Sequence, residues 1–384
     1  MCYNNVAEQP GPRFRQAKPK SAENRGTMNE QRIRRVLENM REHALEQILV
    51  TSTSSIYYLT GYWVEPFERM IALYLNQNGD RILFGNLLFA LEPQDGLTIV
   101  CHTDSDNPVK DLAEAVRPGK LGIDKTWPSK FLIGLCSLRP DITPVLGSAP
   151  VDDAKMLKDA QEIEAMRHSS HVNDQVVEKI ISSVREDMRE NELAAMVEQF
   201  YAEFGADRSS EGQLVCFGAN AADPHHAPAG TVIHSGDCVV FDIFIPIRRY
   251  WCDMTRTVFF RGAGDEQKKV YELVKKANLI AISKVRPGVP LCEIDRAARG
   301  VIEEGGYGPH FTHRLGHGIG LDCHEMPDVS STSPVIAKPG MVFSIEPGIY
   351  LPGKFGVRIE DLVLVTEDGC EVLNAASKDL RIVG

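Results

Sequence analysis

Several features are missing from this 384-residue sequence, and each absence excludes a class of protein. No apolar run approaches the roughly 20 residues that a membrane-spanning helix needs, and the N-terminus lacks the apolar core of a secretory signal. Lys and Arg number 42 against 53 Asp and Glu, so there is no basic excess to neutralise phosphates. No segment repeats as in a solenoid. We therefore expect a compact protein that binds neither nucleic acid nor a membrane.

The nine cysteines are scattered and never form a Cys-x-x-Cys pair. This spacing excludes a zinc knuckle, and the odd number argues against a full disulfide framework. Because a reducing compartment fits this pattern, we expect the protein to be cytoplasmic.

Length and hydrophobic content favour two domains. A chain of this size exceeds what one hydrophobic core usually supports, and 43% hydrophobic residues are enough to fill two cores. Residues 1–27 are polar, rich in proline and basic residues, and have no periodic apolar pattern. We expect them to form a disordered extension.

Residues 28–150 have the pattern of a small α/β domain. Apolar residues recur at helical spacing after Met28, and Gln47 begins a short β-like run. Asn78-Gly79-Asp80 is typical of a hairpin turn. The other strands are expected at 69–76, 81–85, 97–101 and 120–124, with a helix near 109–116. We find no catalytic constellation in this domain.

In residues 154–384 one pattern occurs twice, and each time a pair of helices precedes antiparallel strands. The first set is expected at 154–184 and 190–204 for the helices, and at 212–217 and 238–260 for the strands. The second set is expected at 270–280 and 291–304 for the helices, and at 340–350 and 356–366 for the strands. This predicts an α+β domain built from two similar halves.

Two acids stand inside apolar strands of the first set. Asp242 lies in one β-like run and Asp253 in the next. If the runs form a hairpin that turns at Ile247-Arg248, the two acids lie directly opposite each other, with Cβ atoms about 4.5–5.5 Å apart. Burying an uncompensated charge costs several kcal/mol or more. A divalent cation between the carboxylates would remove their repulsion.

The second set of strands contains another pair of acids. Glu346 and Glu360 are equidistant from Gly353, which lies in the turn-like Pro352-Gly353-Lys354. One isolated pair of this kind is more often an accident of sequence. Two such pairs in apolar strands of one domain are much less often accidental, so they predict a metal site.

A glycine-rich segment between the hairpins offers a nitrogen ligand. Gly316, Gly318 and Gly320 permit tight backbone bends and could bring His317 against a metal. An ordinary loop histidine is the alternative. The glycine spacing is not a dinucleotide fingerprint, and His324-Glu325 does not begin a His-Glu-x-x-His zinc helix.

These motifs resemble those of the creatinase, prolidase and aminopeptidase P superfamily, the Xaa-Pro peptidases of peptidase family M24. The motifs that match in order and spacing are Asp242, Asp253-Met-Thr-Arg-Thr257, Gly316-His317-Gly-Ile-Gly, Ser344-Ile-Glu346-Pro-Gly and Val357-Arg358-Ile-Glu360-Asp361. The resemblance is strong over 154–384 and looser over 28–150. It implies a pita-bread catalytic domain preceded by a smaller α/β creatinase-like N-terminal domain.

The resemblance also implies how two divalent ions would be held. Asp242 would chelate one ion, His317 and Glu346 would bind the other, and Asp253 and Glu360 would bridge the pair. Four carboxylates and one imidazole are hard ligands, so Mn²⁺ is expected, with Co²⁺, Fe²⁺ or Zn²⁺ as alternatives. The implied reaction is hydrolysis of the peptide bond preceding proline, in dipeptides or at longer N-termini.

Further roles follow from the same resemblance. Glu346 would pass a proton from the attacking water to the leaving nitrogen, and His225, rather than His226, would stabilise the tetrahedral intermediate. His324 would contact the substrate, and His313 and Arg358 the proline ring or its carboxylate. The alternatives are that the two histidines merely sit in a loop, and that Arg358 forms a salt bridge to Asp361 or another acid.

One position departs from the family pattern, because Phe244 stands where glycine is usual. This leaves pocket shape and substrate choice open. A creatinase-like enzyme or lyase that acts on a non-peptide substrate and a non-catalytic peptide-binding module are the rival functions. Retention of all five ligands argues against both. Family members are commonly homodimers, so we expect a homodimer.

Overall fold

The computed structural model describes residues 27–207, 209 and 212–384. The chain divides into two compact units, Met1–Ala154 and Lys155–Gly384. Apart from Thr27, the extension that we expected at residues 1–27 lies outside the described residues. Within the described ranges, no helix combines the length and the apolar content needed to cross a bilayer.

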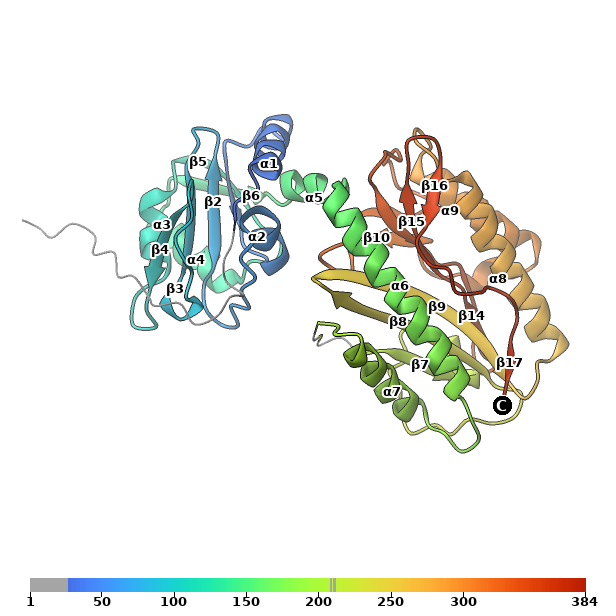
Figure 1. The fold of residues 1–384 in the computed structure, drawn as a ribbon. Coiled ribbons are helices and arrows are strands. Elements are labelled where there is room, and N and C mark those ends of the chain that lie inside the picture. The colour runs from blue at the N-terminus through green and yellow to red at the C-terminus, as the bar shows by residue number, and fades with distance from the viewer. Residues whose placement is uncertain (1–26, 208, 210–211) are drawn as a thin grey trace, which may run out of the picture. The chain divides into compact units, whose positions relative to one another are not determined.

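The first unit is built around a six-stranded sheet with the strand order β4-β3-β2-β1-β5-β6 (Figure 1). Its strands are β1 (Gln47–Val50), β2 (Ala72–Asn76), β3 (Arg81–Asn86), β4 (Thr98–His102), β5 (Gly119–Ile123) and β6 (Ile142–Leu146). Its helices are α1 (Glu30–Glu42), α2 (Thr53–Thr60), α3 (Val109–Ala115) and α4 (Ser129–Leu138), and α5 (Ala149–Met156) leads into the second unit. The predicted hairpin is confirmed: β2 and β3 pair antiparallel, and Gly79 has a φ of 98° in the turn.

The second unit begins with two helices and three antiparallel strands. These elements are α6 (Ala160–Ser183), α7 (Glu190–Glu203), β7 (Leu214–Phe217), the short helix η3 (Gly218–Ala222), β8 (Cys238–Ile247) and β9 (Tyr250–Phe260). The three strands β7, β8 and β9 form a four-stranded sheet with β17 (Ile382–Val383), in the order β17-β9-β8-β7. The predicted helix over 154–184 is in fact two helices. Asp159 and Glu162 form a capping box that starts α6 afresh after the end of α5.

The second half of this unit again starts with two helices, as predicted. Its elements are α8 (Asp265–Lys284), α9 (Leu291–Glu304), η4 (Gly308–His310), β10 (Gly316–Gly318), β11 (Glu325–Val329), β12 (Val342–Ile345), β13 (Gly348–Leu351), β14 (Phe355–Arg358), β15 (Asp361–Val365) and β16 (Cys370–Val372). Five strands form a sheet in the order β11-β10-β12-β15-β16, while β13 and β14 pair with each other.

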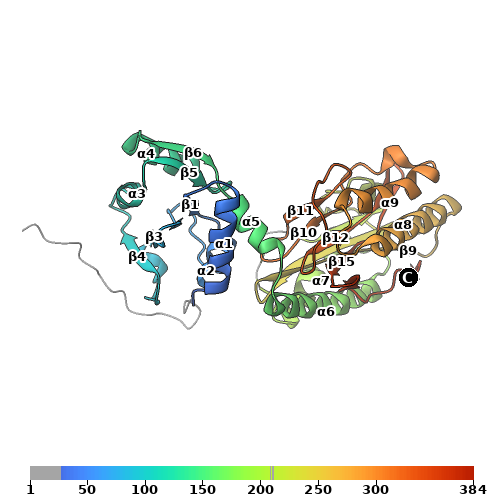
Figure 2. The ribbon, with the colours of Figure 1, turned by 90° about the horizontal axis from the view of Figure 1, so that it is seen from above.

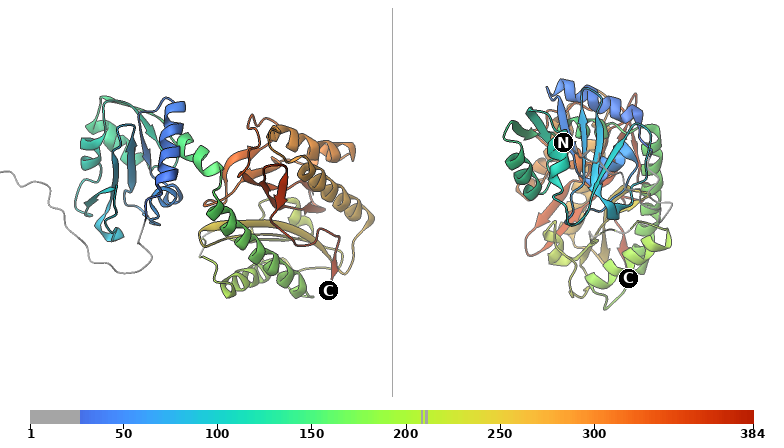
Figure 3. Two further views of the ribbon diagram at one scale, coloured as in Figure 1. Left: turned by 45° about the horizontal axis from the view of Figure 1, so that its top comes forward. Right: turned by 90° about the vertical axis from the view of Figure 1, so that its left-hand side faces the viewer.

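The hairpin of β8 and β9 lies between helices α6 and α7 on one side and helices α8 and α9 on the other (Figures 2 and 3). Val239 and Phe241 pack into the core formed with α6 and α7. Cys238 and Val240 point to the opposite side and pack into the core formed with α8 and α9. Because side chains alternate along a strand, Asp242 lies on the side that faces α8 and α9. The sheet is therefore buried on both faces, and the acids lie in the interior between the halves.

Candidate metal centre

The register of the β8–β9 hairpin corrects the predicted pairing of Asp242 and Asp253. The turn lies at Arg248 and Arg249, whose φ angles are 53° and 75°, so the strands pair one residue later than predicted. Asp242 is opposite Thr255, and Asp253 is opposite Phe244. The two acids are therefore diagonal neighbours on one face, a relation that usually separates residues by roughly 7–8 Å.

The second acid pair follows the predicted register. Gly353 turns the β13–β14 hairpin with a φ of 74°, and the amide of Ile359 donates to the carbonyl of Pro347, one step from Glu346 and Glu360. At these acids the ladder is interrupted, since the amide of Glu346 donates to the carbonyl of Leu315 and that of Glu360 to the carbonyl of Thr255. The interruption ties Glu360 to β9 and Glu346 to the segment that precedes His317.

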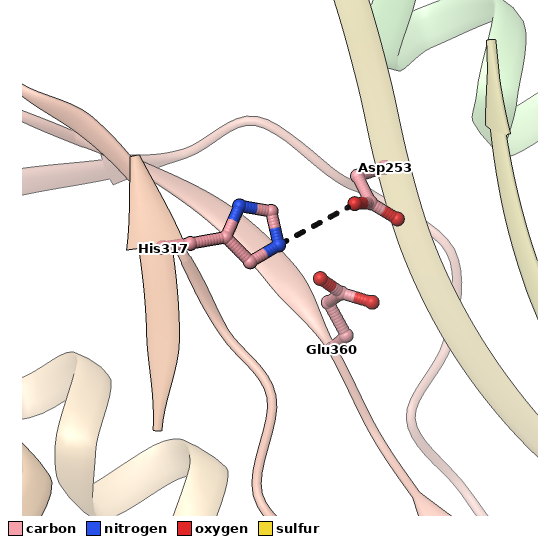
Figure 4. A group of neighbouring side chains, drawn as sticks. All are labelled: Asp253, His317 and Glu360. Atoms are coloured by element: carbon pink, nitrogen blue, oxygen red, sulfur yellow. Dashed lines mark ion pairs between the residues drawn. The ribbon is translucent and has the colours of Figure 1, made fainter. Parts of the chain in front are cut away.

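His317 approaches the acids because its neighbours are glycines. A Cβ atom on Gly316 would overlap the carbonyl of Ser344, and one on Gly318 would overlap the carbonyl of Met326. The glycines thus permit a close approach of strands that no other residue allows. The Nε2 atom of His317 lies 3.8 Å from Asp253 Oδ2 and 3.5 Å from Glu346 Oε1. Figure 4 shows the ring pointing at Asp253, with Glu360 beside them.

The protonation state of His317 suits a metal ligand. Its Nδ1 atom is 3.1 Å from the carbonyl oxygen of Gly318. Because a carbonyl only accepts, Nδ1 must carry the proton, which leaves the lone pair of Nε2 directed at the carboxylates. Burial and the neighbouring His324 lower the pKa of His317 to about 3. The imidazole is therefore neutral at physiological pH.

Positive charge compensates the carboxylates of this site only in part, because Arg358 lowers the pKa values of Asp253 and Glu346 but burial outweighs its effect. Burial, then repulsion from the other acids, raises the pKa values of Asp253 and Glu360 well above the ordinary range. Burial raises the pKa of Glu346 to about 7, with repulsion from Asp242 adding to the shift. Within the described ranges, Asp253 Oδ1 is buried without a hydrogen-bond partner. A divalent cation would satisfy this atom and remove the repulsion, so the residues fit a metal.

The structure brings the predicted ligands together to different degrees. Among the described residues, one group offers three ligand atoms within 4.8 Å of one another, and it consists of Asp253, His317 and Glu360. Glu346 adjoins this group through His317. Asp242 instead has its Oδ2 atom 2.7 Å from Arg358.

Hydroxyl groups orient two of the carboxylates, a role that we did not assign from the sequence although both residues lie in the quoted motifs. Thr255 Oγ1 lies 2.7 Å from Glu360 Oε2, and Ser344 Oγ lies 3.1 Å from Glu346 Oε1. The Ser344 hydroxyl also accepts from the amide of His317 at 3.0 Å. Such contacts fix the direction in which a ligand presents its oxygen atoms.

Arg358 is buried and contacts several groups around the site. Nη2 donates to Asp242, Nη1 donates to the Tyr350 hydroxyl at 2.9 Å, and Nε donates to Thr255 Oγ1 at 3.1 Å. The salt bridge to Asp361 that we considered as an alternative does not form, because Arg256 and Lys378 pair with that acid. Arg358 pairs with another acid, Asp242, which is itself a candidate ligand.

Tyr350 links Arg358 to His313, a connection that sequence reasoning missed. Its hydroxyl lies 2.9 Å from His313 Nε2, and His313 Nδ1 lies 2.7 Å from the carbonyl oxygen of Arg314. The carbonyl requires a proton on Nδ1, so Nε2 accepts from the Tyr350 hydroxyl. Burial raises the pKa of Tyr350 to about 12 and lowers that of His313 to about 4. Both groups are neutral and fixed in direction.

The remaining predicted histidines lie around the same site. The ring of His324 contacts that of His317, with centroids 4.1 Å apart and the ring planes tilted by 40°. Electrostatic interaction with His225 contributes to lowering the pKa values of both His313 and His324. His226 is directed elsewhere, with its Nε2 atom 3.1 Å from Glu190. His225 thus interacts electrostatically with both His313 and His324, whereas the ring of His226 contacts Glu190.

Known proteins match the chain over nearly its whole length. The model of metallopeptidase family M24 matches residues 164–367, and the creatinase/prolidase N-terminal domain matches residues 32–154. An uncharacterized peptidase of Staphylococcus aureus is 35% identical over 359 residues, covering 90% of this chain and 99% of its own length.

Solved structures give the same result. A prolidase from Thermococcus sibiricus is 36% identical with a TM-score of 0.87, covering 93% of this chain and 100% of its own. An Xaa-Pro dipeptidase from Bacillus anthracis is 29% identical with a TM-score of 0.85, covering 92% and 99%. The predicted pita-bread catalytic domain behind a creatinase-like domain is thereby confirmed. The chain is a metallopeptidase that belongs to family M24.

Proposed function

We propose that this protein hydrolyses the peptide bond preceding proline, using two divalent ions held by Asp242, Asp253, His317, Glu346 and Glu360. One observation carries the proposal: Asp253, His317 and Glu360 bring three ligand atoms within 4.8 Å of one another, and among the described residues the buried Oδ1 atom of Asp253 has no hydrogen-bond partner. The similarity to a prolidase and an Xaa-Pro dipeptidase supports the choice of substrate.

Oxygen atoms dominate the proposed ligand set, which favours Mn²⁺ over softer ions. We assign Asp242 to one ion, His317 and Glu346 to the other, and Asp253 and Glu360 to both. Bound divalent ions would polarise the scissile carbonyl and lower the pKa of an attacking water. The raised pKa values of Asp253, Glu346 and Glu360 support this assignment, because burial and mutual repulsion disfavour their negative charges and a bound cation would offset both effects.

Proton transfer is assigned to Glu346. Its carboxylate is held by the Ser344 hydroxyl, which leaves the other oxygen free to accept a proton from water and pass it to the leaving nitrogen. His225 would stabilise the oxyanion of the tetrahedral intermediate, and His324 would contact the substrate. In the described part of the chain, the imidazole of His225 has no hydrogen-bond partner, so it is available for this contact.

Recognition of the prolyl residue is assigned to His313 and Arg358. Arg358 uses three of its five N–H groups on Asp242, Tyr350 and Thr255. The remaining two N–H groups of Arg358 can donate to a substrate carboxylate while the hydrogen bond to Asp242 is kept. This would let one side chain hold a metal ligand and read a free C-terminus.

A small panel of peptides tests this function. Protein loaded with Mn²⁺ is given Ala-Pro, Ala-Pro-Ala and Met-Ala-Ser, and free amino acids are measured. We expect hydrolysis of a proline-containing peptide and none of Met-Ala-Ser. Faster cleavage of Ala-Pro identifies a dipeptidase, and faster cleavage of Ala-Pro-Ala an aminopeptidase. Binding of peptide without cleavage would instead support a binding module, and absence of both would support a non-peptide substrate.

We also propose that the protein is a cytoplasmic homodimer. The eight cysteines within the described residues are all free, which suits a reducing compartment. The dimer is proposed from the family resemblance, and light scattering of the eluting peak in gel filtration tests it directly. A monomer would contradict it.

A further inference from the structure

The carboxylate of Glu190 is fully buried, although no lysine or arginine pairs with it among the described residues. It is the first residue of α7, where the positive end of the helix dipole favours an acid. That effect is modest, and a buried carboxylate also needs several hydrogen-bond donors. Glu190 must therefore accept hydrogen bonds from neighbouring residues.

Four donors surround Glu190, and all belong to the segment 217–229, which contains His225. Oε1 accepts from the amide of Phe217 at 2.8 Å and from Asn220 Nδ2 at 2.9 Å. Oε2 accepts from His226 Nε2 and from the amide of Ala229, each at 3.1 Å. One side chain thus binds the end of β7, the short helix η3 and both sides of His225.

His226 anchors the backbone next to His225. Its ring is directed inward onto Glu190 and is only 23% exposed. His225 is exposed and makes no contact with Glu190. A turn in which the amides of His225 and His226 both donate to Asp223 fixes the backbone between them. The His226 ring is held inward and the backbone between the two residues is fixed, whereas His225 stays exposed and interacts electrostatically with His313 and His324.

We propose that Glu190 and His226 are positioning residues that aim the imidazole of His225 at the reacting carbonyl. The inference rests on the proposed function, because it assigns His225 the role of stabilising the tetrahedral intermediate. Neither positioning residue touches substrate. Their effect on the reaction passes entirely through the placement of His225.

A double-mutant cycle tests this dependence with Ala-Pro hydrolysis by the Mn²⁺-loaded protein. His226→Leu removes the donor to Glu190, and we expect kcat to fall about 10- to 100-fold, since displacing a catalytic group by about 1 Å has effects of that size. In a His225→Ala background, His226→Leu should change kcat less than about 2-fold. Equal losses in both backgrounds would overturn the inference, because a general structural role does not need His225.

Conservative variants separate positioning from folding. His226→Gln places an amide N–H close to the position of Nε2, so it should restore most of kcat and leave KM and bound Mn²⁺ unchanged. Glu190→Gln should lower kcat, since an amide cannot accept from all four donors. Glu192→Gln is the matched control, because Glu192 lies on the same helix, is exposed and only caps the amide of Arg189. Loss of kcat in Glu192→Gln equal to that in Glu190→Gln would contradict the proposal.

A second measurement needs neither metal nor turnover, so it remains decisive if the proposed function fails. In the NMR spectrum of the metal-free protein, the ring C–H signal of His225 is the one missing from His225→Ala. This signal should shift in His226→Leu and return to the wild-type position in His226→Gln. An unshifted signal in His226→Leu would overturn the positioning role. Absence of hydrolysis in the wild type would overturn the proposed function alone.

Discussion

Replacing Glu346 by Gln should stabilise the metal-free protein above neutral pH, although it alters a proposed metal ligand. The pKa of this carboxyl is raised from the ordinary 4.5 to about 7 by burial and by repulsion from Asp242. A carboxyl whose folded pKa is raised contributes stability that is complete below the unfolded value and is lost as pH rises through the folded value. The window is therefore pH 4.5 to about 7.

The expected size follows from the shift in pKa. One pKa unit corresponds to about 1.4 kcal/mol, so ionised Glu346 destabilises the metal-free protein by roughly 3 kcal/mol above pH 7. For a domain of 150–250 residues, 1 kcal/mol moves Tm by about 2–4 °C, which gives roughly 10 °C here. Glu346→Gln has no such charge and should escape this loss.

The assay is thermal unfolding of EDTA-treated protein at pH 5.0 and pH 8.5. The wild type should lose Tm relative to Glu346→Gln between these two pH values, and Mn²⁺ at pH 8.5 should restore stability to the wild type far more than to the variant. Glu367→Gln is the control, because Glu367 is exposed and lies between β15 and β16, outside the proposed ligand set. Parallel pH profiles for the wild type and Glu346→Gln would refute the crowding of charge on which the account rests.

Three further substitutions probe other parts of the site. Asp253→Ala should abolish both metal retention and hydrolysis, as measured by elemental analysis and Ala-Pro cleavage, and unchanged activity would refute its bridging role. Arg358→Ala should raise KM for Ala-Pro more than for Ala-Pro-Ala, because only the dipeptide presents its carboxylate next to the scissile bond; equal changes would remove the carboxylate-reading role. Phe244→Ala should raise kcat/KM for Phe-Pro relative to Ala-Pro by about 10-fold, since the ring lies opposite Asp253 and packs on Trp251; an unchanged ratio would show that Phe244 does not shape the pocket.

The sequence predicted the turn of the β13–β14 hairpin correctly and placed the turn of the β8–β9 hairpin one residue too early. The reason lies in the residues of each turn. Gly353 marks the turn between β13 and β14, because glycine readily adopts a positive φ. In the first hairpin two arginines, Arg248 and Arg249, adopt positive φ angles that their side chains disfavour. No residue type signalled the turn, so symmetry about the wrong point placed Asp242 opposite Asp253.

Which atoms contact each candidate residue could not be predicted from spacing. The partner of Arg358 is Asp242, 116 residues away, and the choice over neighbouring Asp361 depends on Arg256 and Lys378 having already paired with that acid. No role was assigned to Tyr350 from the sequence, although its hydroxyl connects Arg358 with His313. Composition and periodicity identify the strands, whereas these contacts depend on how distant strands pack.

The number of Mn²⁺ ions bound per chain tests the central claim most directly. Metal-free protein is titrated with Mn²⁺ near neutral pH, and free ion is followed by electron paramagnetic resonance while Ala-Pro hydrolysis is recorded in parallel. The account predicts two ions bound per chain, with activity rising as the sites fill. A wild-type chain that binds no divalent ion, or that cleaves Ala-Pro equally well without one, would contradict it.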